Sequence, residues 1–151
     1  MSLDKEVEIL RRIPLFAKIE PAKLKLMAFA SERLTFRSGQ SVVTQGETGD
    51  SAFIIVEGTA DVVVDTPDGK VTVAAMGPND IVGDIAILID VPRTATVVAT
   101  SKLVALKVTK ELFFRMVTDF PQMGVEIMRE LAQRLVKTTA QLTEARAAAS
   151  E

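Results

Sequence analysis

The chain has 151 residues, of which 48% are hydrophobic, and it carries 18 basic and 20 acidic residues for a formal net charge of −2. This length suits one globular domain with a buried core. Because the charges balance and are spread along the chain, no basic field is available to attract a nucleic acid. No run approaches the roughly 20 apolar residues that cross a bilayer, and no signal peptide is evident, so we expect a soluble, cytoplasmic protein with no membrane partner.

The sequence contains neither cysteine nor histidine. Without cysteine there are no disulfides and no thiolate metal sites, and without histidine there is no Ser-His-Asp or Cys-His catalysis and no imidazole ligand. A metalloenzyme of the cupin type would have only carboxylates for its metal. We therefore expect a protein that is not an enzyme and that has no metal site and no cofactor.

Two short helices are predicted in residues 1–31. Apolar residues recur at helical spacing from Leu3 to Ile13, and Pro14 ends that pattern. Pro21 then suits the first turn of a second helix, because proline has no N–H to leave unpaired there. Both helices precede a change of pattern.

Residues 32–108 are predicted to be a β block, because short runs rich in Val, Ile and Thr alternate with Gly, Pro, Asn and Asp. In Pro67-Asp68-Gly69 the proline presets φ and the glycine accepts a positive φ, which predicts a hairpin turn. Many short strands at regular spacing indicate a sandwich, a jelly roll or a small barrel. The predicted strands are Arg33–Arg37, Ser41–Gln45, Ala52–Glu57, Ala60–Asp65, Val71–Met76, Ala95–Ala99 and Lys102–Val108.

Residues 109–151 return to helical spacing. Thr109 is a predicted N-cap, Pro121 interrupts the pattern, and a long helix is expected over about Gln122 to Ala148. Its apolar positions follow the a/d spacing of a coiled coil, which predicts a homodimer through this helix. The alternative is that the same face packs on the domain's own β block and the remaining end frays. The a/d positions are Met128, Leu131, Leu135, Thr138, Leu142 and Ala145.

Residues 82–97 interrupt the β block. Gly83 permits tight backbone geometry, Asp84 can start a short helix, and Pro92 ends this non-strand stretch. Free amides at the start of a helix attract an anion, and the guanidinium of Arg93 can donate two hydrogen bonds to phosphate oxygens. These residues suggest a pocket for a monoanion, the alternative being a surface turn beside an arginine in an ordinary ion pair.

The same segment resembles the phosphate-binding cassette of the cyclic nucleotide-binding domain family. The family pattern is Gly-Glu-apolar-Ala, six residues, then Arg-(Ser/Thr/Ala)-Ala, and the spacing from Gly83 to Ala95 matches it without a gap. Residues 45–55 look like the family's glycine-marked turn and following strand, and residues 13–16 look like its helical lead-in. The resemblance covers about residues 10–135.

The resemblance implies a mainly β fold with flanking helices. The expected fold is a double-stranded β-helix or jelly roll, as in catabolite activator protein-like and protein kinase A regulatory subunit-like β-rolls, with short N-terminal helices and a long C-terminal helix. The resemblance also implies that Arg93 pairs with the cyclic phosphate and that Gly83 lies near the ribose. Backbone N–H groups near Ile85, Ala86 and Ala95 would complete the phosphate site.

Several positions bear on which nucleotide is bound. Asp84 stands where the family has a glutamate that accepts the ribose 2′-hydroxyl, and losing such a hydrogen bond costs on the order of 1–3 kcal/mol. Thr94 stands where a family hydroxyl contacts phosphate or, in some members, guanine. The resemblance therefore implies cAMP or cGMP as the ligand, with cAMP slightly preferred. Thr96 is interpreted as β-branched strand filling. Arg129 and Arg134 are candidates for a lid over the base.

The leading hypothesis is one domain, residues 1–151, that binds a cyclic nucleotide and signals through its C-terminal helices to a dimer seam or a protein effector. The competing hypothesis, prompted by Asp84, is a degenerate member that binds no nucleotide and serves as a dimerisation or docking module. The helix-turn-helix that follows in related transcription regulators has no counterpart in these residues. We therefore expect either a free-standing module or part of a larger protein.

Overall fold

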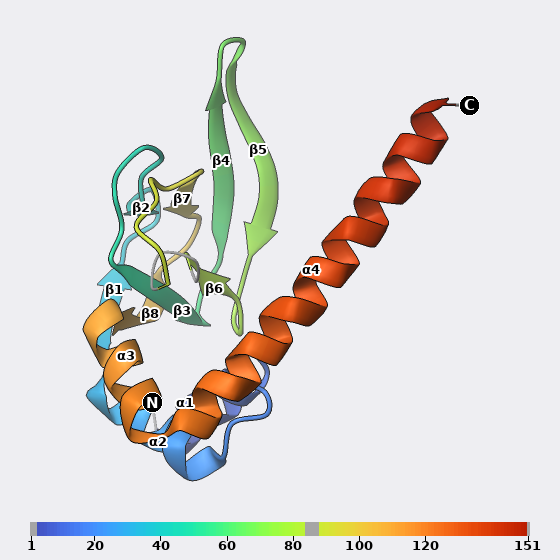
Figure 1. Cartoon of the computed structure of the whole chain (residues 1–151). Helices are drawn as coiled ribbons and strands as arrows, with labels where there is room; N and C mark the ends of the chain where they lie inside the picture. The colour runs from blue at the N-terminus through green and yellow to red at the C-terminus, as the bar shows by residue number, and fades with distance from the viewer. Residues whose placement is uncertain (1–2, 84–87, 151) are drawn as a thin grey trace.

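The computed structural model describes residues 3–83 and 88–150 (Figure 1). Within these residues two helices come first, eight strands follow, and two helices come last. The helices are α1 (Leu3–Arg11), α2 (Pro21–Ala30), α3 (Lys110–Asp119) and α4 (Pro121–Ser150). The strands are β1 (Glu32–Phe36), β2 (Ser41–Val43), β3 (Ser51–Glu57), β4 (Ala60–Thr66), β5 (Gly69–Met76), β6 (Ile81–Val82), β7 (Thr96–Ala99) and β8 (Leu103–Thr109).

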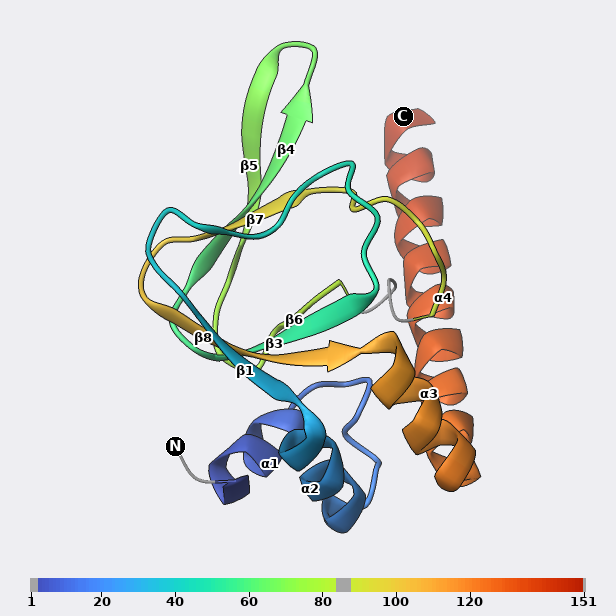
Figure 2. The ribbon, with the colours of Figure 1, turned by 90° about the vertical axis from the view of Figure 1, so that its left-hand side faces the viewer.

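The strands form two antiparallel four-stranded sheets, with the orders β1-β8-β3-β6 and β2-β7-β4-β5. The sheets face each other across the roll, and the helices gather at one end of it (Figures 1 and 2). The expected β-roll with N-terminal helices and a long C-terminal helix is confirmed.

Strand β3 is buried on both of its faces. Side chains alternate between the two faces of a strand, and every residue from Ser51 to Val56 is buried. Ala52, Ile54 and Val56 belong to the core beneath the helices. Phe53 and Ile55 belong to a second core inside the roll. Strand β3 therefore fixes the position of the helices relative to the roll interior.

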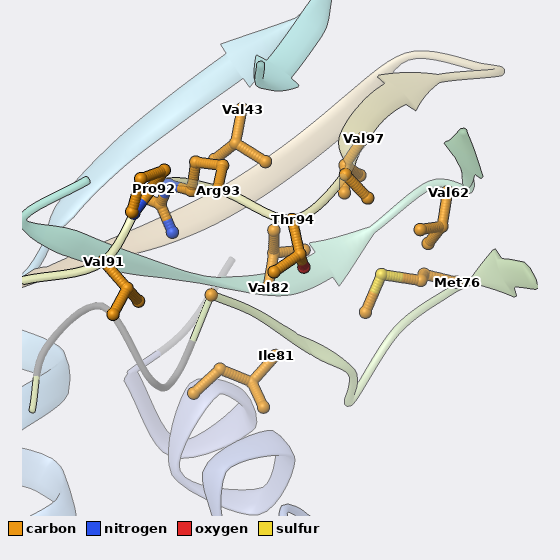
Figure 3. Close-up of a pocket in the computed structure, with 12 residues that line it drawn as sticks. Val43, Val62, Met76, Ile81, Val82, Val91, Pro92, Arg93, Thr94 and Val97 are labelled. Carbon is orange, nitrogen blue, oxygen red and sulfur yellow. The ribbon is translucent and has the colours of Figure 1, made fainter. Parts of the chain in front are cut away.

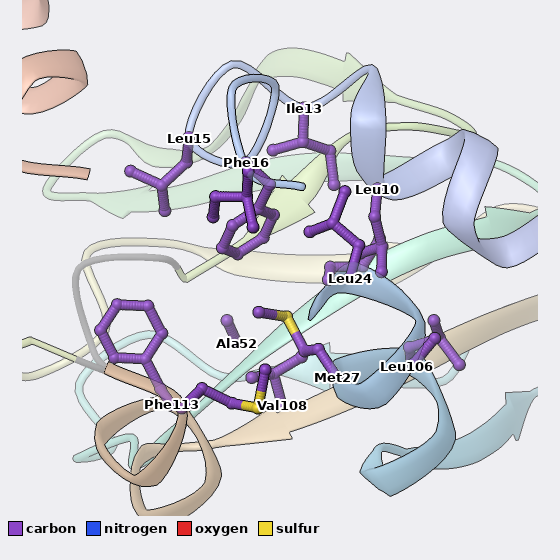
Figure 4. Close-up of a cluster of buried hydrophobic side chains, with 14 of the residues drawn as sticks. Leu10, Ile13, Leu15, Phe16, Leu24, Met27, Ala52, Leu106, Val108 and Phe113 are labelled. Atoms are coloured by element: carbon purple, nitrogen blue, oxygen red, sulfur yellow. The ribbon is translucent and has the colours of Figure 1, made fainter. Parts of the chain in front are cut away.

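The helix-side core joins α1, α2, α3 and the start of α4 to the outer face of β3 and β8 (Figure 4). Phe16 and Phe113 are among its largest fully buried side chains. Full burial of an aromatic or aliphatic side chain contributes about 1.5–3 kcal/mol. Leu106 and Val108 of β8 lie in the same cluster, so α3 starts directly beside this core.

The predicted boundaries differ most where loops are tight. The strand expected over Ser41–Gln45 ends at Val43, because the chain turns at Gly46, whose φ is +88°. Strand β6 was not predicted, since two residues are too few to show alternation. Thr109 is confirmed as the N-cap of α3, because its Oγ1 accepts a 3.1 Å hydrogen bond from the amide of Leu112.

Strands β4 and β5 form a long hairpin that projects from the roll (Figure 1). Thr66 pairs with Gly69 across a two-residue turn made by Pro67 and Asp68, which confirms the predicted turn. Gly69 has a φ of +113°, a value that favours glycine. Strand β5 is the edge of its sheet, and its side chains are mostly exposed.

Helix α4 has 30 residues, which corresponds to about 45 Å at the usual rise per residue. Its start packs on the domain, with Met123 and Ile127 buried and Leu131 partly buried against the same core. The C-terminal part of the helix diverges from the roll (Figure 1), and residues 135–149 are exposed. Among the described helices, none is both long enough and apolar enough to cross a membrane.

Candidate ligand-binding site

A cavity of about 310 Å³ lies inside the roll (Figure 3). Both sheets contribute to it, together with the segment that leads into β7. Its volume falls at the lower end of the roughly 300–1,000 Å³ that is usual for small-molecule sites. The lining residues are Val43, Val62, Met76, Ile81, Val82, Gly83, Val91, Pro92, Arg93, Thr94, Ala95 and Val97.

The two ends of the cavity differ in chemistry. Arg93 lies at one end and is the only charged side chain among the described lining residues. Val62, Val97 and Met76 lie toward the other end (Figure 3). Thr94 adds a hydroxyl between the two ends. This arrangement suits a molecule with one anionic group and a largely apolar body.

Arg93 is held by the start of β3 and by the loop that precedes it. Its Nη2 donates a 2.7 Å hydrogen bond to the carbonyl oxygen of Ser51. A Cβ placed on Gly49 would lie 2.2 Å from the Cζ of Arg93, and one placed on Gly83 would lie 1.9 Å from its Nη1. Both glycines are therefore needed for the guanidinium to occupy this position.

Nη1 of Arg93 is buried and has no hydrogen-bond partner among the described residues. Leaving a buried donor unpaired costs about 1–3 kcal/mol, and more when the group is charged. An anion placed against Nη1 would recover that free energy through a charge-assisted hydrogen bond.

Burial lowers the pKa of the Arg93 guanidinium, and the nearby carboxylate of Asp50 acts in the opposite direction. An arginine starts from so high a pKa that it stays protonated at neutral pH. The cavity thus contains a permanent positive charge that is partly removed from solvent. Such a charge interacts with an anion more strongly than an exposed one does.

The backbone around Arg93 pairs with the loop before β3 in a short antiparallel arrangement. The amide of Arg93 donates to the carbonyl of Glu47 at 2.8 Å, and its carbonyl accepts from the amide of Gly46 at 2.9 Å. Thr48 and Pro92 form an isolated bridge. These contacts fix the backbone from which the guanidinium extends.

Thr96 does more than fill a strand position. Its Oγ1 accepts a 2.9 Å hydrogen bond from the amide of Gln45, and Oε1 of Gln45 accepts from the amide of Asp65 at 2.7 Å. The hydroxyl therefore joins β7 to the loop that follows β2, which is a structural role outside the cavity lining.

The structure brings four of the predicted site residues, Gly83, Arg93, Thr94 and Ala95, to one cavity. The other three, Asp84, Ile85 and Ala86, lie outside the described residues, as does the short helix predicted to start there.

The two lid candidates do not line the cavity. Nη1 of Arg129, whose side chain is exposed, contacts Oε1 of the mostly buried Glu126 at 3.0 Å on the same helix, α4. Arg134 also lies on α4, and it too is absent from the residues that line the cavity.

Sequence reasoning did not include Gly49 and Ser51 in the site, although both contact Arg93 across more than 40 positions. Their position in the stretch that resembles the family's glycine-marked turn was the available signal. The sequence also predicts Val43, Val62 and Met76 only as strand residues, and not as part of a site. Within residues 3–83 and 88–150, no group of three or more acidic side chains is arranged to hold a metal ion.

Comparison with protein families matches residues 33–120 to the family described as cyclic nucleotide-binding domain. Two curated relatives are the "CRP-like cAMP-activated global transcriptional regulator" of Mycobacterium tuberculosis strains CDC 1551 / Oshkosh and ATCC 25618 / H37Rv. Each is 28% identical over 138 residues, which cover 91% of this chain and 62% of the relative. The chain therefore spans less than two thirds of the length of these relatives.

Two solved structures are also similar. The N-terminal domain of a transcriptional regulator from Streptomyces coelicolor A3(2) superposes with a TM-score of 0.83 at 26% identity, over 88% of this chain and 93% of that one. A cyclic nucleotide-binding-like protein from Brucella abortus bv. 1 str. 9-941 gives a TM-score of 0.69 at 31% identity, over 75% of this chain and 97% of that one.

Proposed function

Because the chain belongs to the cyclic nucleotide-binding domain family, we propose that it binds a cyclic nucleotide, cAMP or cGMP, in the cavity beside Arg93 and acts as a regulatory sensor, not as an enzyme. The observation that carries this proposal is Nη1 of Arg93, which is buried without a hydrogen-bond partner among residues 3–83 and 88–150 and lies at one end of a mostly apolar cavity. A cyclic phosphate carries one negative charge, which matches the single positive charge of Arg93.

In this proposal the cyclic phosphate lies against Arg93, and the base extends toward Val62, Val97 and Met76. The amide of Ala95 and the amides near Ile85 and Ala86 complete the phosphate site. Gly83 lies near the ribose, and Asp84 accepts its 2′-hydroxyl. Thr94 contacts the phosphate or the base.

The identity of the nucleotide is a separate part of the proposal. The Mycobacterium tuberculosis relatives are described as cAMP-activated, and this description supports cAMP ahead of cGMP as the ligand. The lining of the apolar end does not favour one purine, because apolar side chains there offer no directed hydrogen bond to a base.

The proposed output runs through α3 and α4. Met128, Leu135 and Leu142 are 62%, 67% and 53% exposed, and they share the predicted a/d face of α4. Two copies paired along this face would bury them in a coiled coil. Nucleotide binding would then change how the two α4 helices pair, or how α4 contacts a protein effector.

A thermal-shift experiment tests the function directly. The protein is heated with cAMP, with cGMP and with 5′-AMP as the control for a nucleotide that lacks the cyclic phosphate. A specific ligand at 100 times its Kd adds about 2.7 kcal/mol to the free energy of unfolding. No shift with either cyclic nucleotide at millimolar concentration would contradict the sensor and would favour the dimerisation or docking module.

A further inference from the structure

Lys110, the first residue of α3, contacts both segments that surround Arg93. Its backbone amide donates a 2.9 Å hydrogen bond to the carbonyl of Asp50. Its Nζ lies 2.7 Å from Oδ1 of Asp90. The start of α3 is therefore joined to the loop before β3 and to the segment before β7.

Both partners of Lys110, Asp50 and Asp90, are close in the chain to residues that hold or carry the guanidinium. Asp50 lies between Gly49 and Ser51, which pack against and accept from the Arg93 side chain. Asp90 precedes Arg93 by three positions in the chain. Figure 2 shows the segment that leads into β7 descending toward the start of α3.

Helix stability does not explain a lysine at this position. The N-terminal turn of a helix carries partial positive charge, so a cation there is disfavoured and an acidic residue is preferred. The ion pair contributes little to global stability, because the Asp90 side chain is 71% exposed and exposed pairs are weak. Its effect is on where the segment before Arg93 lies.

We propose that Lys110 is a positioning residue for the anion site, and that its ion pair with Asp90 holds the segment before Arg93 at the start of α3. The part of this inference that concerns ligand affinity rests on the proposed function. The pair fixes the guanidinium in advance of binding, and it makes the start of α3 part of the site. A bound anion therefore stabilises the same contacts that anchor α3.

The experiment compares Lys110→Met, Asp90→Asn and the charge-exchange double variant Lys110→Asp with Asp90→Lys. Arg11→Met is the matched control, because it removes another surface ion pair, with Glu8, on α1. One readout is hydrogen exchange of the Arg93 amide in the ligand-free protein, followed by NMR. The other is the Kd for cAMP, measured by calorimetry.

Each single variant is expected to speed exchange of the Arg93 amide and to weaken cAMP binding by about two- to fivefold, the range expected for one exposed ion pair. The double variant is expected to restore both values, which a loss of packing would not do. Arg11→Met is expected to change neither.

The two proposals fail in different ways. Wild-type exchange and wild-type affinity in both single variants would overturn the role of Lys110 and leave the proposed function intact. If the wild-type protein bound neither cAMP nor cGMP, the proposed function would fall. The exchange rates of the ligand-free variants would then still decide the positioning role.

Discussion

Gly83 leaves the space that Nη1 of Arg93 occupies: a Cβ on this glycine would lie 1.9 Å from that nitrogen. Gly83 also has a φ of +75°, which side chains rarely adopt. A Cβ on Gly49 would also collide with this guanidinium, although Gly49 does not have a positive φ. The two glycines together form a slot, the space beside both backbones that the guanidinium of Arg93 occupies and that a side chain at either position would fill.

Gly49→Ala tests the slot without adding backbone strain. The new methyl group would displace the guanidinium, so we expect the Kd for cAMP to rise at least tenfold in calorimetric titration. Gly77→Ala is the matched control, because Gly77 also lacks a positive φ and has no heavy atom within 4 Å of an added Cβ. Equal affinities in the two variants would contradict the role of the slot.

Arg93→Met separates binding from folding. The substitution removes a partly buried charge with an unpaired donor, and it also leaves the carbonyl of Ser51 without its hydrogen bond. Because these effects oppose each other, we expect the free energy of unfolding to change by less than about 1 kcal/mol. Urea unfolding of the ligand-free protein measures this, and a loss of several kcal/mol would show that the arginine serves the fold.

Arg33→Met is expected to destabilise the fold strongly. Both carboxylate oxygens of Glu6, which is fully buried on α1, accept hydrogen bonds from the guanidinium of Arg33 on β1. Removing the arginine leaves a buried charge unpaired, which costs about 3 kcal/mol. Arg11→Met, at an exposed pair, is expected to cost at most about 1 kcal/mol. Urea midpoints compare the two, and equal losses would refute the distinction.

The dimer seam is tested by two neighbouring substitutions on α4. Leu135 and Val136 are 67% and 70% exposed, but only Leu135 lies at an a/d position. We expect Leu135→Glu to yield a monomer in sedimentation equilibrium and Val136→Glu to remain a dimer, since a carboxylate in a coiled-coil seam must be desolvated. A wild-type monomer, or dimers in both variants, would remove the seam from the proposal.

The sequence predicted the architecture because the β block and the helices have different periods. Short apolar runs between turn residues located β3 and β8, and the resemblance of residues 83–95 to the family's phosphate-binding cassette pointed to the cavity beside Arg93. Pro67-Asp68-Gly69 marked its turn through φ preferences alone. These features are local, and each can be derived from a few adjacent residues.

The remaining contacts depend on how distant segments meet. The glycine-marked turn singles out the stretch around Gly49 and Ser51, but it does not indicate that an arginine more than 40 positions later contacts both residues, since that follows from the closure of the roll. The link from Lys110 to Asp90 depends likewise on where β8 ends relative to the segment before β7. Thr96 was interpreted as strand filling because its partner, the amide of Gln45, lies on another strand connection.

Calorimetric titration of the wild-type protein and of Arg93→Ala with cAMP and with cGMP tests the central claim most directly. We predict saturable binding of at least one of the two nucleotides to the wild-type protein, and affinity at least tenfold lower in Arg93→Ala, because the charged hydrogen bond to the cyclic phosphate is lost. Equal affinity in the two proteins, or no binding of either nucleotide to the wild-type protein, would contradict it.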